Sequence, residues 1–245
     1  MASWDWQLYC TDMVTNEAAP QCFGAKGYET YLDAMVQAWG WTLYVSVAGL
    51  FVALIVGSLM GVLRTLPNRK LALLGEVWTE FFRNIPLIVQ VFLWYHVVPQ
   101  IFAPLQAVPS SILVIFAIGF FTSARIAEQV KAGILTLPTG QRYAGLAVGF
   151  TLPQTYRFVL LPMAFRIVIP PLTSESMNIV KNSAVAFAVS IPELAQYAQQ
   201  ASEQSNFFQI FLPVTLLYFV SGFAINRVAK LIERSVRVPG ILGAK

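Results

Sequence analysis

The sequence lacks most of the side-chain groups that enzymes use. It has one histidine, His96, and two cysteines, Cys10 and Cys22, and it contains no G-x-x-x-x-G-K-[ST] phosphate-binding loop. A metal centre or a nucleophile with its base needs several such groups together, and Glu175, Lys181 and His96 form no such set. The chain is therefore not expected to be an enzyme, to hydrolyse ATP, or to bind a metal or cofactor of its own.

Charged residues are also scarce. They make up 11% of the 245 residues, whereas hydrophobic residues make up 57%, and the mean hydropathy is +0.63. A soluble domain of this length cannot bury so much apolar surface. Uncharged runs cover residues 34–63, 84–124 and 204–226, and each is longer than the roughly 20 residues that cross a bilayer core. The sequence therefore predicts an all-α integral membrane protein.

The number of spans depends on two further stretches. The run over 84–124 is divided into two spans joined by a short turn, because it contains Pro99, Pro104 and Pro109. A less hydrophobic span is expected at about 164–191. Five transmembrane helices result, with the expected limits 1–38 for an amino-terminal segment, 39–235 for the membrane domain and 236–245 for a tail.

Lysine and arginine are distributed unevenly between the predicted loops. The amino-terminal segment has only Lys26, and the turns after the second and fourth spans have neither residue. The other loops contain Arg64, Arg69, Lys70, Arg125, Lys131, Arg142, Arg157, Arg166, Arg227, Lys230, Arg234, Arg237 and Lys245. Because basic loops stay inside, the amino terminus is expected outside and the carboxyl terminus inside. The net charge of +4 is thus accounted for by the inside loops, and no nucleic acid partner is expected.

The amino-terminal segment is expected to remain on the protein as an outside amphipathic segment. Its first 33 residues have no basic start and no clean apolar core, so they do not form a cleavable signal peptide. Cys10 and Cys22 both lie in this segment. On the oxidising side of the membrane they form either a disulfide or two free thiols, and the sequence leaves both alternatives open.

A polar stripe runs along the fourth span. Ser174, Glu175, Asn178, Lys181 and Asn182 fall within an arc of about 120° when successive residues are placed 100° apart on a helix. Charged groups that face lipid are costly, so the stripe is expected to face a protein interior or a wet cavity. Two interpretations remain open. The stripe either joins helices in a buried network, with Glu175 neutralising a partner, or lines a translocation path.

Two prolines precede the stripe. Pro170 and Pro171 are expected to interrupt the start of the fourth span, with Thr173 or Ser174 capping a fresh helix behind them.

Two cations near the stripe are of interest. Lys181 lies six residues from Glu175, which is not an i,i+4 spacing, so its own helix compensates it poorly. Arg125 ends the third span, where Glu128 and Lys131 follow at intervals of three residues. This spacing permits an alternating salt-bridge ladder on one helical face. The alternative is that these charges simply gather at an inside helix end.

The run YAGLAVGFTLPQTYRFVLLP, residues 143–162, has a fixed internal spacing. It resembles the signature loop of bacterial ABC-importer permeases, which reads Glu-Ala-Ala, three residues, Gly, nine residues, Ile-x-Leu-Pro. The positions that match it are Ala144, Gly149, Leu161 and Pro162, with Val159 in place of the isoleucine. Tyr143 and Gly145 replace the glutamate and the second alanine.

Other segments carry the resemblance further. FFRNIPLIVQ, AEQVKAGI, LPTGQ and VKNSA follow one another as in permease subunits of polar-amino-acid ABC importers of the histidine, glutamate and glutamine type. The resemblance covers roughly residues 40–235. Within that family the chain looks most similar to the glutamate/aspartate subunits, whose tail motif VR-x-PG is present as Val236, Arg237, Pro239 and Gly240.

This resemblance implies a type I importer fold of five helices in the bacterial inner membrane. The loop at about 141–162 would couple to two cytoplasmic ATPase subunits, which hold the ATP and Mg. The other implied partners are a second permease, similar or identical, and a periplasmic amino-acid-binding protein.

The residue after Lys181 gives an expectation about the cargo. Many relatives that carry neutral or basic amino acids have an aspartate at that position, whereas this chain has Asn182. The uncompensated cation, with help from Arg125, is therefore expected to favour glutamate or aspartate. The alternatives are the same machinery carrying glutamine, histidine or another polar amino acid and, more remotely, a self-contained channel.

Overall fold

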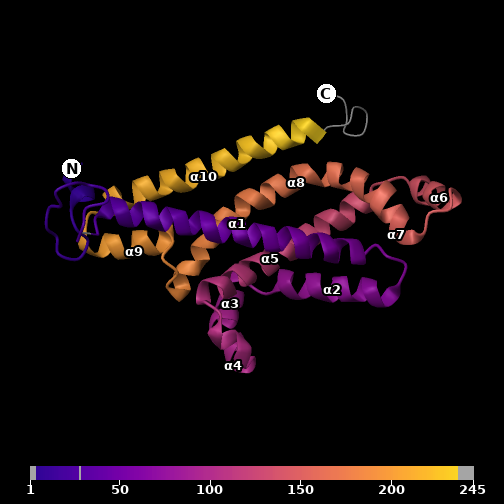
Figure 1. The fold of residues 1–245 in the computed structure, drawn as a ribbon, viewed down its shortest axis with the longest axis horizontal. Helices are drawn as coiled ribbons and strands as arrows, with labels where there is room; N and C mark the ends of the chain where they lie inside the picture. The colour runs from indigo at the N-terminus through magenta and orange to yellow at the C-terminus, as the bar shows by residue number, and fades with distance from the viewer. Residues whose placement is uncertain (1–3, 28, 237–245) are drawn as a thin grey trace.

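The computed structural model describes residues 4–27 and 29–236, and these ranges are helical apart from turns and two isolated bridges. The α-helices, labelled in Figure 1, are α1 (Tyr31–Leu63), α2 (Arg69–Asn84), α3 (Leu87–Phe92), α4 (Val98–Ile101), α5 (Ser110–Leu135), α6 (Thr139–Ala147), α7 (Leu152–Thr155), α8 (Leu161–Asn182), α9 (Leu194–Gln204) and α10 (Phe207–Val236). The predicted all-α class is confirmed. The tail residues Arg237, Pro239 and Gly240 lie outside the described ranges.

Short helical segments of other types join several of these helices. The 3-10 segments are η1 (Gln7–Cys10), η3 (Ala103–Ala107) and η5 (Ser183–Val189), and the π-helical segments are η2 (Leu93–Val97) and η4 (Tyr156–Leu160).

Four helical stretches of the described chain are long and apolar enough to cross a membrane, namely Tyr31–Leu63, Ser110–Leu135, Leu152–Val189 and Phe207–Ser235. A fifth candidate exists only if α2 and the stretch Leu87–Ile101 are counted as one span, since they meet at 104°. The five predicted spans are thus matched by four helical stretches and this bent pair. Pro86 disfavours helical backbone at Ile85, which is extended at φ −92° and ψ 129°, so the chain bends there.

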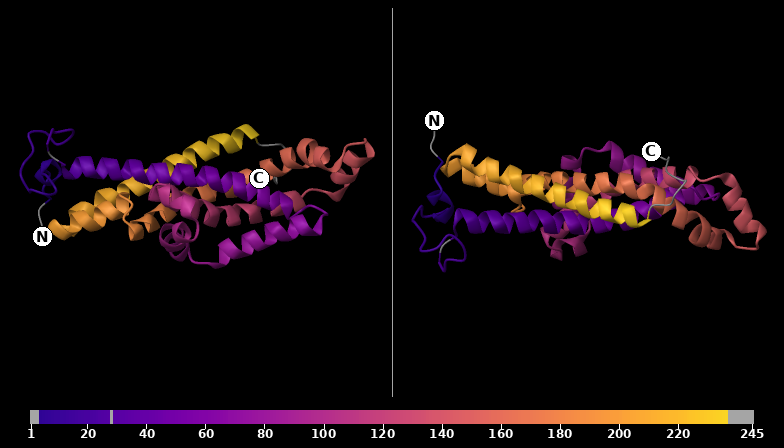
Figure 2. Two further views of the ribbon diagram at one scale, coloured as in Figure 1. Left: turned by 60° about the horizontal axis from the view of Figure 1, so that its bottom comes forward. Right: turned by 90° about the horizontal axis from the view of Figure 1, so that it is seen from above.

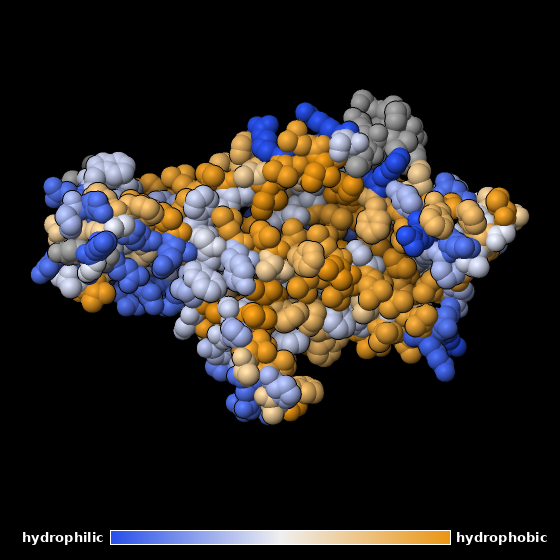
Figure 3. Space-filling view, viewed as in Figure 1, coloured by the Kyte–Doolittle hydropathy of each residue, from blue (hydrophilic) through white to orange (hydrophobic). Residues whose placement is uncertain are grey.

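The surface of the molecule shows where a membrane would lie. Apolar residues cover most of its middle, hydrophilic residues gather at one end of the long axis, and the other end mixes hydrophilic and apolar residues (Figure 3). The amino-terminal segment, α9 and the start of α10 form one end, and α6 with α7 forms the other (Figure 2). These two ends are thus separated by the length of the apolar bundle.

The centre of the bundle is the close contact of α1 with α5. A Cβ atom built on Gly57 of α1 would lie 2.7 Å from Cβ of Ile126, and one built on Gly61 would lie 2.7 Å from Cβ of Val130. Ala53, one turn before Gly57, is fully buried on the same side. Small residues at intervals of four therefore let the two helices approach closely, as is typical of membrane helix pairs.

α8 passes through its two prolines without ending. It runs from Leu161 to Asn182 with Pro170 and Pro171 inside it, so the predicted break is wrong. Neither Thr173 nor Ser174 caps a new helix, and the Thr173 hydroxyl instead donates to the carbonyl of Ile169 at 3.2 Å. Packing against neighbouring helices commonly supports prolines inside membrane helices. Here Val168 and Glu175 are buried on either side of them.

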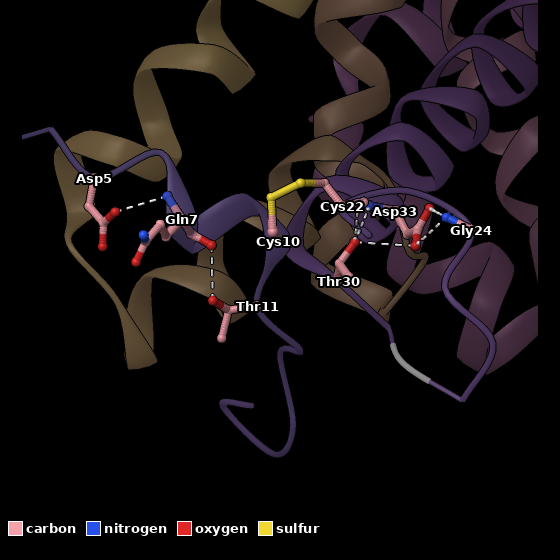
Figure 4. The surroundings of a disulfide bond; sticks show 8 residues. All are labelled: Asp5, Gln7, Cys10, Thr11, Cys22, Gly24, Thr30 and Asp33. Atoms are coloured by element: carbon pink, nitrogen blue, oxygen red, sulfur yellow. Dashed lines mark hydrogen bonds between the residues drawn. A yellow bond between two sulfur atoms is a disulfide. The ribbon is translucent and has the colours of Figure 1, made fainter. Parts of the chain in front are cut away.

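The amino-terminal segment is a compact unit closed by a disulfide between Cys10 and Cys22 (Figure 4). The structure thus forms the disulfide, one of the two alternatives that the sequence left open. The Thr30 hydroxyl donates to the carbonyl of Cys22 at 2.7 Å and caps α1 by accepting from the N–H of Asp33 at 3.2 Å. The disulfide loop is therefore tied to the first turn of α1.

Asp12 organises the rest of this unit. Its Oδ1 atom accepts from the N–H groups of Thr15 and Val14, both at 2.8 Å, and its Oδ2 atom accepts from the N–H of Glu29 at 2.6 Å. These backbone donors, that of Thr15 first, lower the pKa of Asp12 to about 2. The ionised carboxylate therefore holds together two chain segments 17 residues apart.

The same end of the molecule is fastened to the helices by two tyrosines. The Tyr9 hydroxyl donates to the carbonyl of Gln209 on α10 at 2.6 Å, and the Tyr197 hydroxyl on α9 donates to the carbonyl of Tyr31 on α1 at 3.0 Å. The amino-terminal unit, α1, α9 and α10 therefore form one packed assembly.

Candidate translocation face and coupling tip

The predicted loop forms a compact projection, the α6–α7 tip, made of residues 139–158 (Figure 1). α6 ends where Gly149 adopts a φ of +91°. The N–H of Phe150 donates to the carbonyl of Gly145 at 3.1 Å, and the N–H of Gly149 donates to that of Leu146 at 3.0 Å. These two bonds make a Schellman motif, which needs a residue in the left-handed region. Glycine at 149 therefore permits the reversal without strain.

The structure explains why residue 145 is glycine where the resembling loops have alanine. A Cβ atom at Gly145 would lie 2.8 Å from Cγ2 of Thr155, a buried residue whose hydroxyl donates to the carbonyl of Thr151 at 3.1 Å. Next to it, the Tyr156 hydroxyl donates to the carbonyl of Thr65 at 2.8 Å. The tip is thereby closed on itself and anchored to the end of α1.

The predicted loop residues do not all share one surface. Tyr143 is 68% exposed, Ala144 and Gly149 are also exposed, and Gly145 is buried. The last two motif residues, Leu161 and Pro162, lie beyond the tip and begin α8. Only the first part of the motif is therefore available at the tip for a partner to contact.

Glu175 on the polar stripe of α8 is paired with α5. Its Oε2 atom accepts from Nε of Arg125 at 2.8 Å, and its Oε1 atom accepts from Nη2 of Arg125 at 3.1 Å and from Nε2 of Gln129 at 3.0 Å. Glu175 is only 4% exposed, and bidentate pairs of this kind are strong and directional. The pair therefore clamps α8 to α5.

Of the two alternatives for these charges, the ladder along α5 does not form, because Arg125 pairs with Glu175 instead of Glu128. Glu128 accepts from Arg64 at 2.8 Å and from Arg83 at 3.4 Å, while Lys131 lies 3.5 Å from Glu76. Pairs three residues apart on an exposed helix are weak. Tertiary contacts between α1, α2, α5 and α8 supply better-placed partners for each of these charges.

The rest of the polar stripe is less buried than Glu175. Ser174 and Lys181 are exposed, and Asn178 and Asn182 are half-buried. No ion pair to Lys181 occurs within residues 4–27 and 29–236. The stripe is thus divided between an edge that binds helices together, at Glu175, and an edge on the surface of this subunit.

Two residues that the sequence analysis did not single out contribute to these networks. Gln129 follows Arg125 by one turn on the same face, a spacing that was readable in the sequence. The Arg64 side chain is 2% exposed and binds both Glu76 and Glu128 at 2.8 Å. Its partners are 12 and 64 residues away, so no local pattern could have identified them.

Another buried carboxyl lies near the end of the molecule formed by the amino-terminal segment and α9. Glu193 caps α9 by accepting from the N–H of Gln196 at 2.9 Å, and it accepts from the Tyr218 hydroxyl on α10 at 2.7 Å. Burial raises the pKa of Glu193. No local sequence pattern singles out Glu193, because only the fold places Tyr218 beside it.

The side chains of the described residues form no metal-binding cluster. Within the ranges that the structure describes, no three His, Cys, Asp or Glu residues are grouped so that they could hold an ion. The His96 ring packs against Phe92 and Tyr95, at centroid distances of 6.0 and 4.7 Å. His96 therefore belongs to an aromatic cluster.

Comparison with known proteins identifies several relatives. The chain is 40% identical over 256 residues to the glutamate/aspartate import permease protein GltJ of Escherichia coli K12, covering 99% of this chain and 98% of that protein. It is 33% identical over 204 residues to the glutamate transport system permease protein GluD of Corynebacterium glutamicum, covering 81% and 73%. It is 30% identical over 196 residues to the probable glutamine ABC transporter permease protein GlnP of Bacillus subtilis, covering 78% and 88%.

The fold agrees with these relationships. A solved structure of the MetNI methionine ABC transporter in an inward-facing conformation matches with a TM-score of 0.73 at 25% identity, over 84% of this chain and 98% of that one. Residues 53–238 match the family described as binding-protein-dependent transport system inner membrane component. The resemblance and the type I importer fold predicted from the sequence are thus confirmed. The chain belongs to this family, the permease subunits of ABC importers, in which a separate subunit hydrolyses ATP.

Proposed function

We propose that this permease subunit carries glutamate and aspartate into the cell across the bacterial inner membrane. The observation that carries the proposal is the 40% identity to a glutamate/aspartate import permease over nearly the whole of both chains. Identity that extends over nearly the whole of both chains supports a shared transport path and shared partner surfaces.

The proposed orientation places the amino terminus outside and the carboxyl terminus inside. It is supported by the basic loops, which are expected inside, and by the disulfide at the other end, since disulfides persist on the oxidising side. Two ATPase subunits, holding ATP and Mg, would then dock at the α6–α7 tip. A binding protein would deliver the amino acid at the end formed by the amino-terminal unit and α9, and a second permease, similar or identical, would complete the path.

The preference for acidic cargo is proposed to depend on Lys181. This side chain is exposed at the surface edge of the polar stripe, and the neighbouring Asn182 supplies no counter-charge. Arg125 attracts a cargo carboxylate less strongly than its position in the sequence suggests. Its Nε and Nη2 atoms already bind Glu175, whose negative charge offsets that of the guanidinium. A cation without a partner attracts a side-chain carboxylate, and the attraction is stronger where the path excludes water.

The experiment is reconstitution of the chain with its co-expressed second permease, ATPase and binding protein, followed by ATP hydrolysis across a panel of amino acids. We expect stimulation by glutamate and aspartate. Stimulation by glutamine or histidine alone would refute the cargo and support a substrate like that named for the glutamine permease relative. Conduction by the isolated chain would instead indicate a channel.

Lys181→Met is the variant that tests the residue. We expect it to lower glutamate-driven transport at least roughly tenfold, equivalent to about 1.4 kcal/mol, with assembly of the complex retained. Lys230→Met is the matched control, since Lys230 is an exposed lysine on α10 outside the polar stripe. Equal effects of the two substitutions would contradict the role of Lys181. Asn182→Asp should shift preference away from glutamate, because it supplies the missing counter-charge.

A further inference from the structure

A groove opens between the amino-terminal unit and the two helices α1 and α10. Its walls include Trp4 and Trp6 of the unit, Met35 of α1, and Leu212 and Leu216 of α10. Its volume is about 450 Å³, and the described residues that form its walls expose no polar atom. Burying a polar group without a hydrogen bond is costly, so the groove favours an apolar occupant.

The groove runs from the polar end of the molecule into the apolar middle. α10 starts beside the amino-terminal unit (Figure 2), and Leu212 and Leu216 lie about 8 and 14 Å along it at 1.5 Å per residue. Tryptophan side chains collect where a membrane meets water, which suits the wall formed by Trp4 and Trp6. The groove therefore leads from the headgroup level to the depth of the hydrocarbon chains.

Hydrocarbon is the apolar material that surrounds α10 at this depth. Trp6 is 73% exposed and Leu216 is 53% exposed, so the walls of the groove are open to the surroundings of the molecule. Three separate segments form these walls, and they touch a chain on more sides than a flat helix face does. Because dispersion contacts add up, one acyl chain should stay here longer than lipids stay on the rest of the surface.

The charge beside the groove favours a particular headgroup. Asp5 stands between Trp4 and Trp6 in the sequence, and its Oδ1 atom accepts from the N–H of Gln7 at 2.8 Å (Figure 4). Its Oδ2 atom has no hydrogen bond or ion pair to any residue of 4–27 and 29–236. Residues 1–33 contain five carboxylate side chains and, as their basic residue, Lys26. An ammonium group is therefore attracted to this end, and an anionic headgroup is repelled.

We propose that this groove binds one acyl chain of a phospholipid with an ammonium headgroup, and that the ammonium pairs with Asp5. Such a lipid fastens the amino-terminal unit to α10, beside the hydrogen bond from Tyr9 to the carbonyl of Gln209. The inference goes beyond the proposed function, because it concerns neither the cargo nor the path.

The test of the groove replaces Leu216 by tryptophan. The larger side chain removes room for two or more methylene groups, so affinity for the lipid should fall about tenfold or more. Leu231→Trp is the matched control, since Leu231 is an exposed leucine of the same helix outside the groove. Retained lipid is measured by native mass spectrometry of the assembled permease pair, after exchange in detergent with known amounts of phosphatidylethanolamine. Leu212→Trp replaces Leu216→Trp if the latter does not assemble.

The test of the headgroup is a competition between phosphatidylethanolamine and phosphatidylglycerol at equal concentrations. We expect phosphatidylethanolamine to be retained about two- to fivefold more, the effect of one exposed ion pair. Asp5→Asn should abolish this preference and leave the total retained lipid unchanged, because its amide oxygen can still accept from Gln7. Glu17→Gln is the matched control, an exposed carboxylate of the same unit outside the groove.

Three results would count against the proposal. Equal retention of lipid by Leu216→Trp, or its replacement, and Leu231→Trp would overturn it. Loss of the lipid when the second permease joins the unsubstituted chain would also overturn it, since the groove would then be a contact between permeases. An unchanged headgroup preference in Asp5→Asn would overturn the pairing with Asp5. These measurements do not involve the cargo, so their failure is distinct from failure of the proposed function.

Discussion

The contact between Gly145 and Thr155 makes a quantitative prediction about the α6–α7 tip. Gly145→Ala would place a methyl group 2.8 Å from Cγ2 of Thr155 and 3.2 Å from its Oγ1 atom. Overpacking of this kind costs about 1–3 kcal/mol. Replacing glycine by alanine in a helix otherwise gains about 0.5–1 kcal/mol. We therefore expect the tip to lose about 1–2 kcal/mol of local stability.

A second substitution tests the cause. Thr155→Ser removes Cγ2, the atom in closest contact, and keeps the hydroxyl that donates to the Thr151 carbonyl. By itself it should cost about 1 kcal/mol, the value for one buried methyl group. In that background Gly145→Ala should become neutral or stabilising by up to about 1 kcal/mol, because the new methyl group occupies the vacated space. The sign of the Gly145→Ala effect should thus reverse.

Hydrogen exchange is the suitable assay, because the tip can open without unfolding the bundle. The amides of Val148, Gly149 and Phe150 donate to carbonyls inside the tip, so their exchange reports its opening. A loss of 1–2 kcal/mol makes exchange about 5–30-fold faster. Unchanged exchange in Gly145→Ala, or no relief by Thr155→Ser, would refute the packing explanation for glycine at this position.

Three further predictions concern other parts of the molecule. Arg125→Ala leaves the Glu175 carboxylate buried with only part of its partners and should destabilise the permease by about 1–3 kcal/mol in thermal unfolding, whereas Glu175→Gln added to it should recover part of the loss. Asp12 has a lowered pKa, so its carboxylate stabilises the fold fully at pH values above its ordinary pKa of 3.8. This contribution is lost as the pH falls towards 2. Protease resistance of residues 4–30 should fall over this range, and Asp12→Asn should abolish the dependence. Cys10→Ser should cost about 3 kcal/mol locally, the value for a loop of this length, and should speed proteolysis of the same segment; equal cleavage of wild type and variant would contradict it.

Several features of the molecule followed from local sequence properties. Long uncharged runs predict membrane helices because each residue adds independently to the free energy of transfer into lipid. The reversal after α6 was readable because Gly149 meets a backbone requirement that depends only on its own φ. Apolar helices and the loop motif together indicated the fold class and the family.

Other features depended on which helices meet. Arg125 binds Glu175, 50 residues away, instead of Glu128 three residues away. Pro170 and Pro171 were expected to break a helix that its neighbours in fact support. Glycine at 145 has no explanation until Thr155 packs against it.

The sequence by itself therefore determined the membrane class, the helical content and the position of the loop motif, since hydropathy and turn chemistry act over a few residues. Only the tertiary structure decided which charges pair, where a helix continues through proline and which positions allow no side chain. These outcomes depend on distances between atoms that are far apart along the chain, and the fold alone brings such atoms together.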